Sequence, residues 1–217
     1  CGTGSPLPDR TRAGPCLAVI AGQHTFVFDA GDGASETLSL MGVNQSEIEA
    51  LFLTHIHSDH IDGLDTVALQ HWANGPAETP LLVVGLPGTA RVVAGLNEAY
   101  ALDQSYRAAH HGPEVMPPGG AGMTAREFAL PLADGEETEV HNADGVRIVA
   151  FRVDHAPTEA VGYRVEYGGR SIVISGDTSR SASLTQAARG ADLLIHEAIS
   201  PRLDAIMPAA AALAWLC

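Results

Sequence analysis

The sequence contains no lysine, and its 12 basic residues are all arginine. It has 26 acidic residues, which gives a net charge of −14 at pH 7. Proteins whose main partner is a nucleic-acid backbone usually carry a basic patch. The composition supplies no such excess, although a local arginine cluster on the folded surface stays open. The charge balance therefore argues against RNA or DNA as the main partner.

Long hydrophobic runs and cysteine are also scarce. No stretch approaches 18 consecutive apolar residues, so we expect no transmembrane helix and no membrane partner. The three cysteines are Cys1, Cys16 and Cys217, with no C-x-x-C pair, and we expect no disulfide framework. They do not indicate a compartment, so the cytoplasm is the default and a secreted or periplasmic location stays open.

The remaining composition is that of a globular protein, with 46% hydrophobic and 18% charged residues. A length of 217 residues suits one domain, predicted here to span 1–217. The opening Cys1-Gly2-Thr3-Gly4 is typical of a strand exit, and the last residues stop inside an apolar helical run without a stop signal. We therefore expect an N-terminal strand and a C-terminal segment to be missing.

Turn signals divide the chain into short elements. Gly22-Gln23 and Gly168-Gly169 each separate two apolar runs and predict hairpins. Helices are predicted from about 63 to 72, from 87 to 100, and from about 202 to 217. Residues 101–124 are expected to form a lid-like loop, because His-His-Gly-Pro and Pro-Pro-Gly-Gly interrupt them. Runs of strands with helices between them indicate layered sheets flanked by helices.

The strongest chemical signal is the segment Thr54-His55-Ile56-His57-Ser58-Asp59-His60, which follows an apolar strand. Alternate residues at a strand end point the same way, so His55 and His57 can bind one metal ion together. The following turn directs Asp59 and His60 towards a second ion. Imidazole and carboxylate groups suit Zn²⁺ and similar divalent ions.

Two later residues also follow apolar strands. His155 comes after the strand that ends near Val153, and it can complete three imidazoles around the first ion. Asp177 follows the strand around Ile174 and a glycine, and its carboxylate can span two ions about 3.5–4 Å apart. The structural alternatives are a core histidine and a helix N-cap.

His-x-His-x-Asp-His, with Phe28-Asp29-Ala30-Gly31 before it and His155 and Asp177 after it, resembles the motif set of the metallo-β-lactamase superfamily. The resemblance implies an α+β fold, a four-layer αββα sandwich of two mixed sheets flanked by helices. It implies two divalent metal ions, expected to be Zn²⁺. It assigns His55, His57 and His155 to one ion, Asp59, His60 and Asp177 to the other, and a supporting role to Asp29.

Within that superfamily, Leu194-Ile195-His196-Glu197-Ala198 resembles a motif of the ribonuclease Z and arylsulfatase-like branch. His57 stands where oxygen-reducing relatives carry glutamate, so the resemblance favours hydrolysis over redox chemistry. Asp177 stands where lactam-cleaving enzymes carry other residues, so a lactam-cleaving enzyme is disfavoured. Many ribonuclease Z enzymes carry a long arm between the last two metal motifs, but only 22 positions separate His155 from Asp177 here. The chain also stops before two later histidine motifs, so we expect weaker binding at the second ion.

The resemblance implies a zinc-dependent hydrolase in which a metal-bridging hydroxide attacks a phosphodiester or sulfate ester. Asp59 would orient or deprotonate the water, and His196 and Glu197 would lie near the leaving group or support the site. His110 and His111 are candidates for lining the substrate mouth, with a solvated loop pair as the alternative. A small ester is favoured over an RNA 3′ end. Lactone hydrolysis, an inactive metal-binding fragment and, by analogy, a homodimer stay open.

Overall fold

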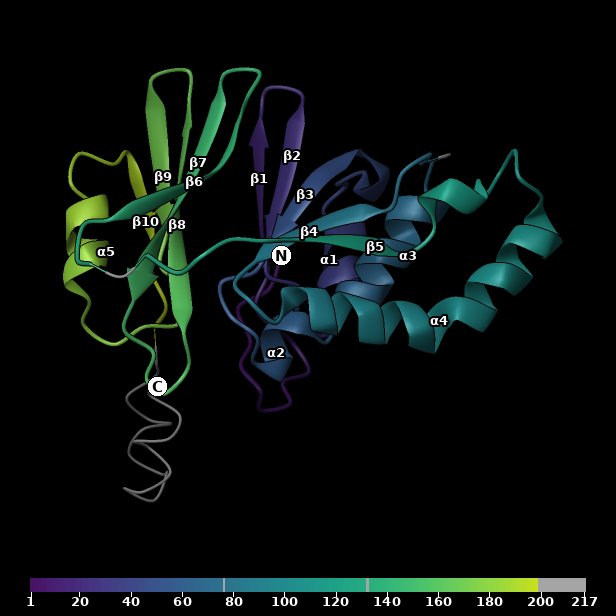
Figure 1. Cartoon of the computed structure of the whole chain (residues 1–217), viewed down its shortest axis with the longest axis horizontal. Coiled ribbons are helices and arrows are strands. Elements are labelled where there is room, and N and C mark those ends of the chain that lie inside the picture. Colours follow the sequence, from purple (N-terminus) through teal and green to yellow (C-terminus); the bar gives the residue numbers. More distant parts are fainter. Residues whose placement is uncertain (76, 132, 199–217) are drawn as a thin grey trace. The chain divides into compact units, whose positions relative to one another are not determined.

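The computed structural model describes residues 1–75, 77–131 and 133–198. The chain forms two compact units, Cys1–Glu127 and Phe128–Cys217, and each contains a mixed β-sheet and at least one helix among the described residues (Figure 1). The helix expected over 202–217 lies outside the described residues. Within the described ranges, no helix combines the length and apolar character needed to cross a membrane.

The first unit contains a sheet with the strand order β1-β2-β3-β4-β5. Its strands are β1 (Leu17–Ala21), β2 (His24–Phe28), β3 (Ile48–Phe52), β4 (Leu81–Gly85) and β5 (Met123–Glu127). β1 and β2 form the hairpin predicted at Gly22-Gln23, and the pairs from β2 to β5 are parallel. Because parallel strands end at the same edge, the segments that follow β2, β3 and β4 gather there.

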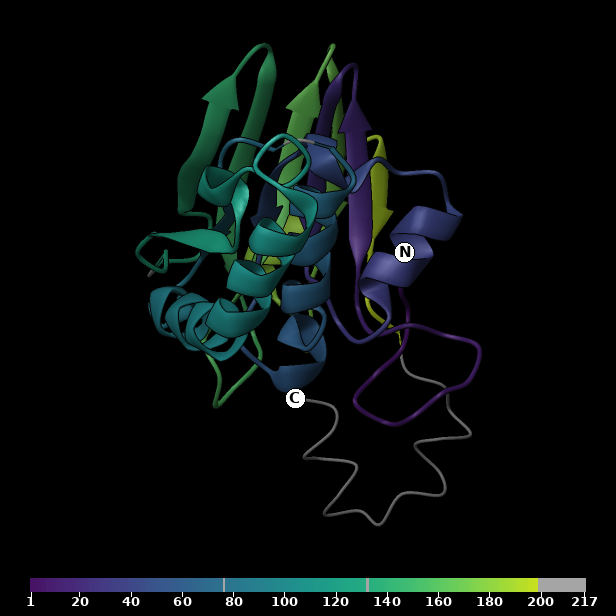
Figure 2. The ribbon, with the colours of Figure 1, turned by 90° about the vertical axis from the view of Figure 1, so that its right-hand side faces the viewer.

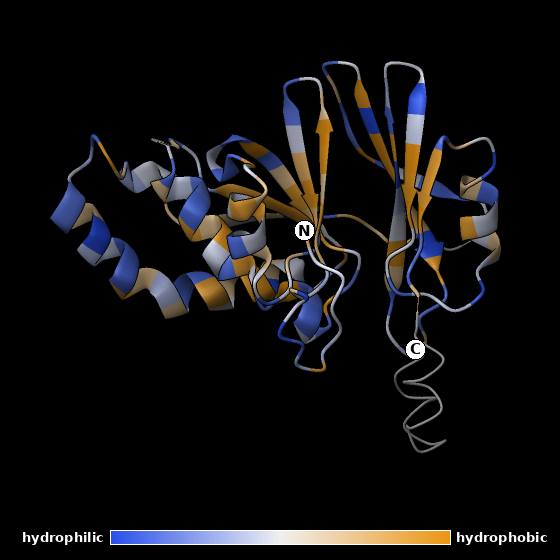
Figure 3. Cartoon of the chain, turned by 180° about the vertical axis from the view of Figure 1, so that it is seen from behind, coloured by the Kyte–Doolittle hydropathy of each residue, from blue (hydrophilic) through white to orange (hydrophobic). Residues whose placement is uncertain are grey.

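Helices cover one face of this sheet (Figure 2). They are α1 (Ala34–Leu40), α2 (Ser58–Ile61), α3 (Leu64–Ala73) and α4 (Thr89–His111), with 3₁₀ turns η1 (Gln45–Glu47) and η2 (Pro118–Gly120). Buried side chains of the strands, such as Leu51 and Val83, pack with Leu38 of α1 and Val67 of α3. Strands β3 and β4, which are mostly apolar in sequence, are largely coloured as hydrophobic in Figure 3.

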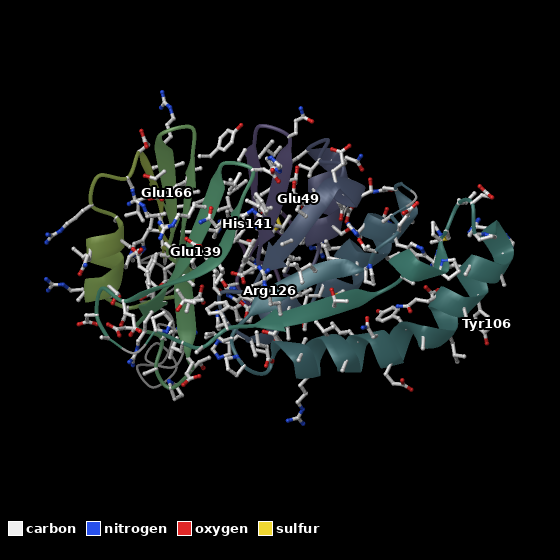
Figure 4. The ribbon with its side chains drawn as sticks, turned by 45° about the horizontal axis from the view of Figure 1, so that its top comes forward. Glu49, Tyr106, Arg126, Glu139, His141 and Glu166 are labelled. Carbon is white, nitrogen blue, oxygen red and sulfur yellow. A yellow bond between two sulfur atoms is a disulfide. The ribbon has the colours of Figure 1, made fainter. Side chains whose placement is uncertain are left out.

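The lid-like loop predicted over 101–124 is wrong for much of its length. Helix α4 continues to His111, and Figure 4 labels Tyr106 on this exposed part of the helix. The alanine-rich sequence favours a helix, and the Asp103–Arg107 pair, at 2.7 Å, supports it. The first helix breakers come only at Gly112-Pro113. Strand β5 then begins at Met123, inside the expected loop.

The second unit contains a sheet with the strand order β10-β9-β8-β7-β6. Its elements are β6 (Glu137–Ala143), β7 (Val146–Val153), β8 (Ala160–Tyr167), β9 (Arg170–Ile174), α5 (Ala182–Ala187) and β10 (Leu193–Ile195). The hairpin predicted at Gly168-Gly169 is confirmed: both glycines have positive φ, 57° and 75°, as a two-residue hairpin turn requires. Leu184 of α5 packs with Phe151 and Val173 of the sheet.

A network of charged residues lies on this second sheet, where Figure 4 labels Glu139 and Glu166. Arg147 donates to both, at 2.9 and 3.0 Å, and Arg164 donates to Glu166 at 2.8 Å. Arg164 also donates to the backbone oxygen of Ala187 at 2.7 Å, so the network reaches the C-terminal end of α5. The bond from Arg164 lowers the pKa of Glu166, burial opposes it, and the bond from Arg147 lowers the pKa again.

Because the folded pKa of Glu166 lies below its unfolded value of about 4.3, its carboxylate stabilises the fold above that pH, and the contribution is lost as the pH falls through the folded pKa. We expect Glu166→Gln to flatten the dependence of the urea unfolding midpoint on pH below about 5. Glu137→Gln, at an exposed position on β6, is the control and should keep the wild-type slope. Equal slopes for all three proteins would contradict the prediction.

The expectation of no disulfide is wrong, because Cys1 and Cys16 form a disulfide with a Cα–Cα distance of 5.0 Å. Gly2 and Cys16 pair as an antiparallel bridge, in which the Gly2 amide donates to the Cys16 carbonyl at 2.9 Å. This pairing carries the first residue of the chain to Cys16, within the distance range that a disulfide needs. Spacing along the sequence does not reveal such a contact.

Candidate metal centre

The extended chain that leaves β3 carries the first two histidines of the cluster. His55 and His57 are alternate residues, and their rings lie with centroids 4.6 Å apart. His55 Nε2 and His57 Nδ1 approach to 2.9 Å. Two ring nitrogens this close can both reach one ion, since Zn–N bonds are about 2.0–2.1 Å long.

The short helix α2 brings the other two candidate ligands to the same place. His57 is the N-cap residue of α2, and its extended backbone conformation lets the chain turn into the helix. The His60 ring then lies 4.1 Å from the His55 ring, and Asp59 Oδ2 lies 3.7 Å from His60 Nε2. The structure therefore brings together the four side chains that the motif predicts within this unit.

Asp29, which directly follows β2, contacts the segment Thr54–His60 through its carboxylate. Its Oδ1 accepts from the Thr54 amide at 2.8 Å, and its Oδ2 accepts from Thr54 Oγ1 at 2.8 Å. Asp29 Oδ2 also lies 2.9 Å from His60 Nδ1. Asp29 has a positive φ of 56°, a conformation that aspartate tolerates better than most residues. These contacts hold Asp29 in its unusual backbone conformation. They also orient the His60 ring so that its Nδ1 faces Asp29.

The backbone packs closely behind the cluster. Ala30 donates its amide to the His60 carbonyl at 2.9 Å, and Gly63 donates to the Ala30 carbonyl at 2.8 Å. A Cβ on Gly31 would lie 2.1 Å from the Asp59 carbonyl oxygen and 2.7 Å from Gly14 Cα. Only glycine therefore allows this approach between the segment after β2 and helix α2.

We expect Gly31→Ala to lower the free energy of unfolding by about 1–3 kcal/mol, because the added methyl group meets backbone atoms that must shift. Gly95→Ala is the matched control: a Cβ there meets nothing within 4 Å, and alanine favours the helix. It should raise the free energy by about 0.5–1 kcal/mol. Urea unfolding of both variants checks the prediction, which fails if Gly31→Ala leaves the stability unchanged.

Negative charge accumulates beside the cluster. Burial raises the pKa of Asp62, and the neighbouring carboxylate of Asp59 raises it further. Asp32 and Asp65 add to the same effect. A cation placed among these groups would relieve their repulsion. The acidic surroundings and the converging ring nitrogens both fit a divalent metal ion.

The second unit places its candidate ligands on two joined loops. His155 follows β7, and Asp177 follows β9. Thr178 Oγ1 lies 3.1 Å from the Asp154 amide, which donates to it, and the Ser179 amide donates to the Asp154 carbonyl at 2.7 Å. These bonds tie the loop of His155 to the loop of Asp177.

Glu197 and His196 lie just after β10. Glu197 Oε1 accepts from the Thr178 amide at 2.8 Å, and the Glu197 amide donates to Ser175 Oγ at 3.0 Å. His196 is exposed, and its Nδ1 lies 2.8 Å from the Glu197 carbonyl oxygen. Glu197 thus supports the loop of Asp177, the second of the two roles considered for it.

His110 and His111 lie in the last turn of α4, exposed, with ring centroids 4.8 Å apart. Figure 1 shows this end of α4 far from α2, so the structure does not bring the pair to the His55–His60 cluster. Their expected place beside the substrate depended on a loop over 101–124, and the helix removes that loop.

A family model described as "Metallo-beta-lactamase superfamily" matches residues 10–207. The chain belongs to this superfamily. Its fold is accordingly the α/β sandwich of two mixed sheets flanked by helices, as predicted. The crystal structure of human tRNase Z, short form, matches with a TM-score of 0.66 and 23% identity, over 90% of this chain and 75% of that one, and supports the fold alone.

Curated relatives indicate which branch of the superfamily this chain is similar to. "Ribonuclease Z" of Mycolicibacterium gilvum (strain PYR-GCK) is 39% identical over 212 residues, covering 95% of this chain and 70% of the relative. "Ribonuclease Z" of Mycobacterium bovis (strain BCG / Pasteur 1173P2) is 40% identical over 201 residues, covering 91% and 68%. This metallo-beta-lactamase protein is therefore a ribonuclease Z-like hydrolase, and the arylsulfatase-like alternative finds no support among these relatives.

The sequence does not indicate a role for Thr54, although the structure places its side chain between Asp29 and the histidines. No local signal indicates this contact, because Asp29 lies 25 positions away and meets Thr54 only through the pairing of β2 with β3.

Proposed function

We propose that this superfamily member is a metal-dependent phosphodiesterase that cleaves RNA, as the name of its curated relatives suggests. The observation that carries the proposal is the His55–His60 cluster, with its ring nitrogens 2.9 Å apart at the closest pair and Asp29 behind it. The relatives' name favours RNA, against the sequence-based preference for a small ester. Because the net charge of the chain is negative, we expect RNA recognition to depend on local arginine side chains rather than on overall charge.

The superfamily pattern assigns the residues that would hold the metal. His55, His57 and His155 would hold one divalent ion, and Asp59, His60 and Asp177 would hold a second, with Zn²⁺ as the proposed ion. When bound, such ions polarise the phosphoryl oxygens and make water a stronger nucleophile at neutral pH.

The chain's own residues then orient the groups and move protons. We assign to Asp59 the acceptance of a proton at its carboxylate from the attacking water, because it lies next to His60 at the start of α2. His196 Nδ1 faces the Glu197 carbonyl, so Nε2 is the ring atom that we assign to proton transfer to the leaving oxygen. Glu197 keeps the Asp177 loop in place through Thr178.

The experiment measures zinc per chain and cleavage of three substrates: a tRNA transcript with a 3′ extension, an aryl sulfate and a lactone. We expect bound zinc and cleavage of the RNA, loss of cleavage with a chelator, and recovery with Zn²⁺. His57→Ala should lower cleavage by at least about 10³-fold, since two metal sites act as a unit. His24→Ala, on β2, where the ring contacts the Glu49 carboxylate, is the control and should retain activity.

Faster turnover of the sulfate or the lactone than of RNA would overturn the substrate assignment. Absence of bound zinc together with unchanged activity in His57→Ala would overturn the metal mechanism. The predicted homodimer can be checked on the same samples by light scattering.

A further inference from the structure

The Thr54 hydroxyl lies at the centre of the buried contacts behind the cluster. Its Oγ1 is 2.8 Å from Asp29 Oδ2 and 3.0 Å from His55 Nδ1. Thr54 has no exposed surface, and His55 is 1% exposed. In such surroundings a hydroxyl is held in one orientation, because solvent cannot offer alternative partners.

Chemistry fixes the direction of each bond. An ionised carboxylate only accepts hydrogen bonds, so the Thr54 hydroxyl donates its proton to Asp29 Oδ2. The oxygen of Thr54 then presents lone pairs to His55, and His55 Nδ1 must be the protonated ring nitrogen that donates.

This tautomer has a consequence on the other side of the ring. With the proton on Nδ1, the lone pair of His55 lies on Nε2, the atom that faces His57 Nδ1 at 2.9 Å. That is the position in which the proposed function requires a metal ligand. The opposite tautomer would carry a proton there and could not bind a metal ion through Nε2.

We infer that Thr54 is a positioning residue that sets the His55 tautomer and so prepares Nε2 to bind the metal ion. This inference rests on the proposed function. Asp29 acts directly on His60 and reaches His55 through the Thr54 hydroxyl. Thr54 Oγ1 lies 3.0 Å from His55 Nδ1 but 3.5 Å from His60 Nδ1, so its closer histidine contact is with His55.

Two variants test the inference. Thr54→Val keeps the shape of the side chain but removes the hydroxyl, whereas Thr54→Ser keeps the hydroxyl. The matched control is Thr89→Val, because Thr89 is also fully buried and its hydroxyl donates to the Leu86 carbonyl, at 2.7 Å. Thr89→Val measures the general cost of removing a buried hydroxyl in the same unit.

Two readouts are used on the full chain. Proton–nitrogen NMR of the histidine rings reports the His55 tautomer in the metal-free protein, and competition with a chromophoric chelator reports Zn²⁺ affinity. We expect an Nδ1–H tautomer for wild type and Thr54→Ser, and its loss in Thr54→Val. Zn²⁺ affinity should fall about 10–100-fold in Thr54→Val, and stay within about threefold of wild type in Thr54→Ser and Thr89→Val.

An Nε2–H tautomer in wild type would overturn the inference, even if Thr54→Val fails to fold. So would wild-type Zn²⁺ affinity in a folded Thr54→Val. If wild type shows the Nδ1–H tautomer but binds no Zn²⁺, the proposed function fails and the tautomer assignment stands, so the two failures are distinguishable.

Discussion

Asp29→Asn is expected to lower the free energy of unfolding by about 2–6 kcal/mol. The carboxylate of Asp29 faces three donors: the Thr54 amide, the Thr54 hydroxyl and the ring of His60. The asparagine side chain can accept from the Thr54 amide through its oxygen. Its NH₂ group then faces the Thr54 hydroxyl and the His60 ring, and it cannot accept a hydrogen bond from either. Two buried donors lose their acceptor, and each such loss costs about 1–3 kcal/mol. Urea unfolding of the metal-free protein measures this effect.

The same variant should lower Zn²⁺ affinity about 10–100-fold, because the His60 ring loses the partner that orients it. Asp144→Asn is the control, because it makes the same change of charge at an exposed position in the turn between β6 and β7. Its stability should stay within about 0.5 kcal/mol of wild type. Equal stability of wild type and Asp29→Asn would contradict the assigned bonding.

Breaking the Cys1–Cys16 disulfide is expected to lower the free energy of unfolding by about 3 kcal/mol, the entropic effect of opening a loop of about 15 residues. Cys1→Ser is the cleaner variant, because Cys16 is buried in the core beside Val27 and Ala30. Urea unfolding of this variant under non-reducing conditions measures the loss.

Reduction of the wild-type protein with a dithiol provides the control for this second prediction. The reduced wild type and Cys1→Ser should have the same stability, and the dithiol should not change Cys1→Ser further. The Gly2–Cys16 backbone bridge involves no sulfur atom, so we expect it to persist in both proteins and not to contribute to the difference. A wild type whose stability does not change on reduction would contradict the prediction.

The elements that the sequence predicted well are those with strong local signals. The hairpins at Gly22-Gln23 and Gly168-Gly169 are specified by residues next to each other in the chain. The sequence-based prediction ends helix α4 too early, because it extends the loop indicated by the glycine and proline residues from Gly112 onward back to residue 101. The Asp103–Arg107 pair and the alanines of that segment were the local evidence for the longer helix.

The candidate ligands within the first unit were predictable because they lie within six positions of one another. The type and order of His55, His57, Asp59 and His60 after a strand indicate that their side chains converge, and the structure places these side chains close together. Membership in the superfamily was predictable because Asp29, His155 and Asp177 accompany this segment in the sequence as further motif residues.

Other features depend on contacts between residues far apart in the sequence, and these only the tertiary structure decided. Asp29 meets Thr54 across 25 positions because β2 and β3 are parallel neighbours that end at the same edge. The Cys1–Cys16 disulfide requires the bridge at Gly2. The sequence by itself thus determined which groups can bind a metal ion, whereas parallel strand pairing decided how Asp29 and Thr54 orient them, because a hydrogen bond forms only where the folded backbone places donor and acceptor about 3 Å apart.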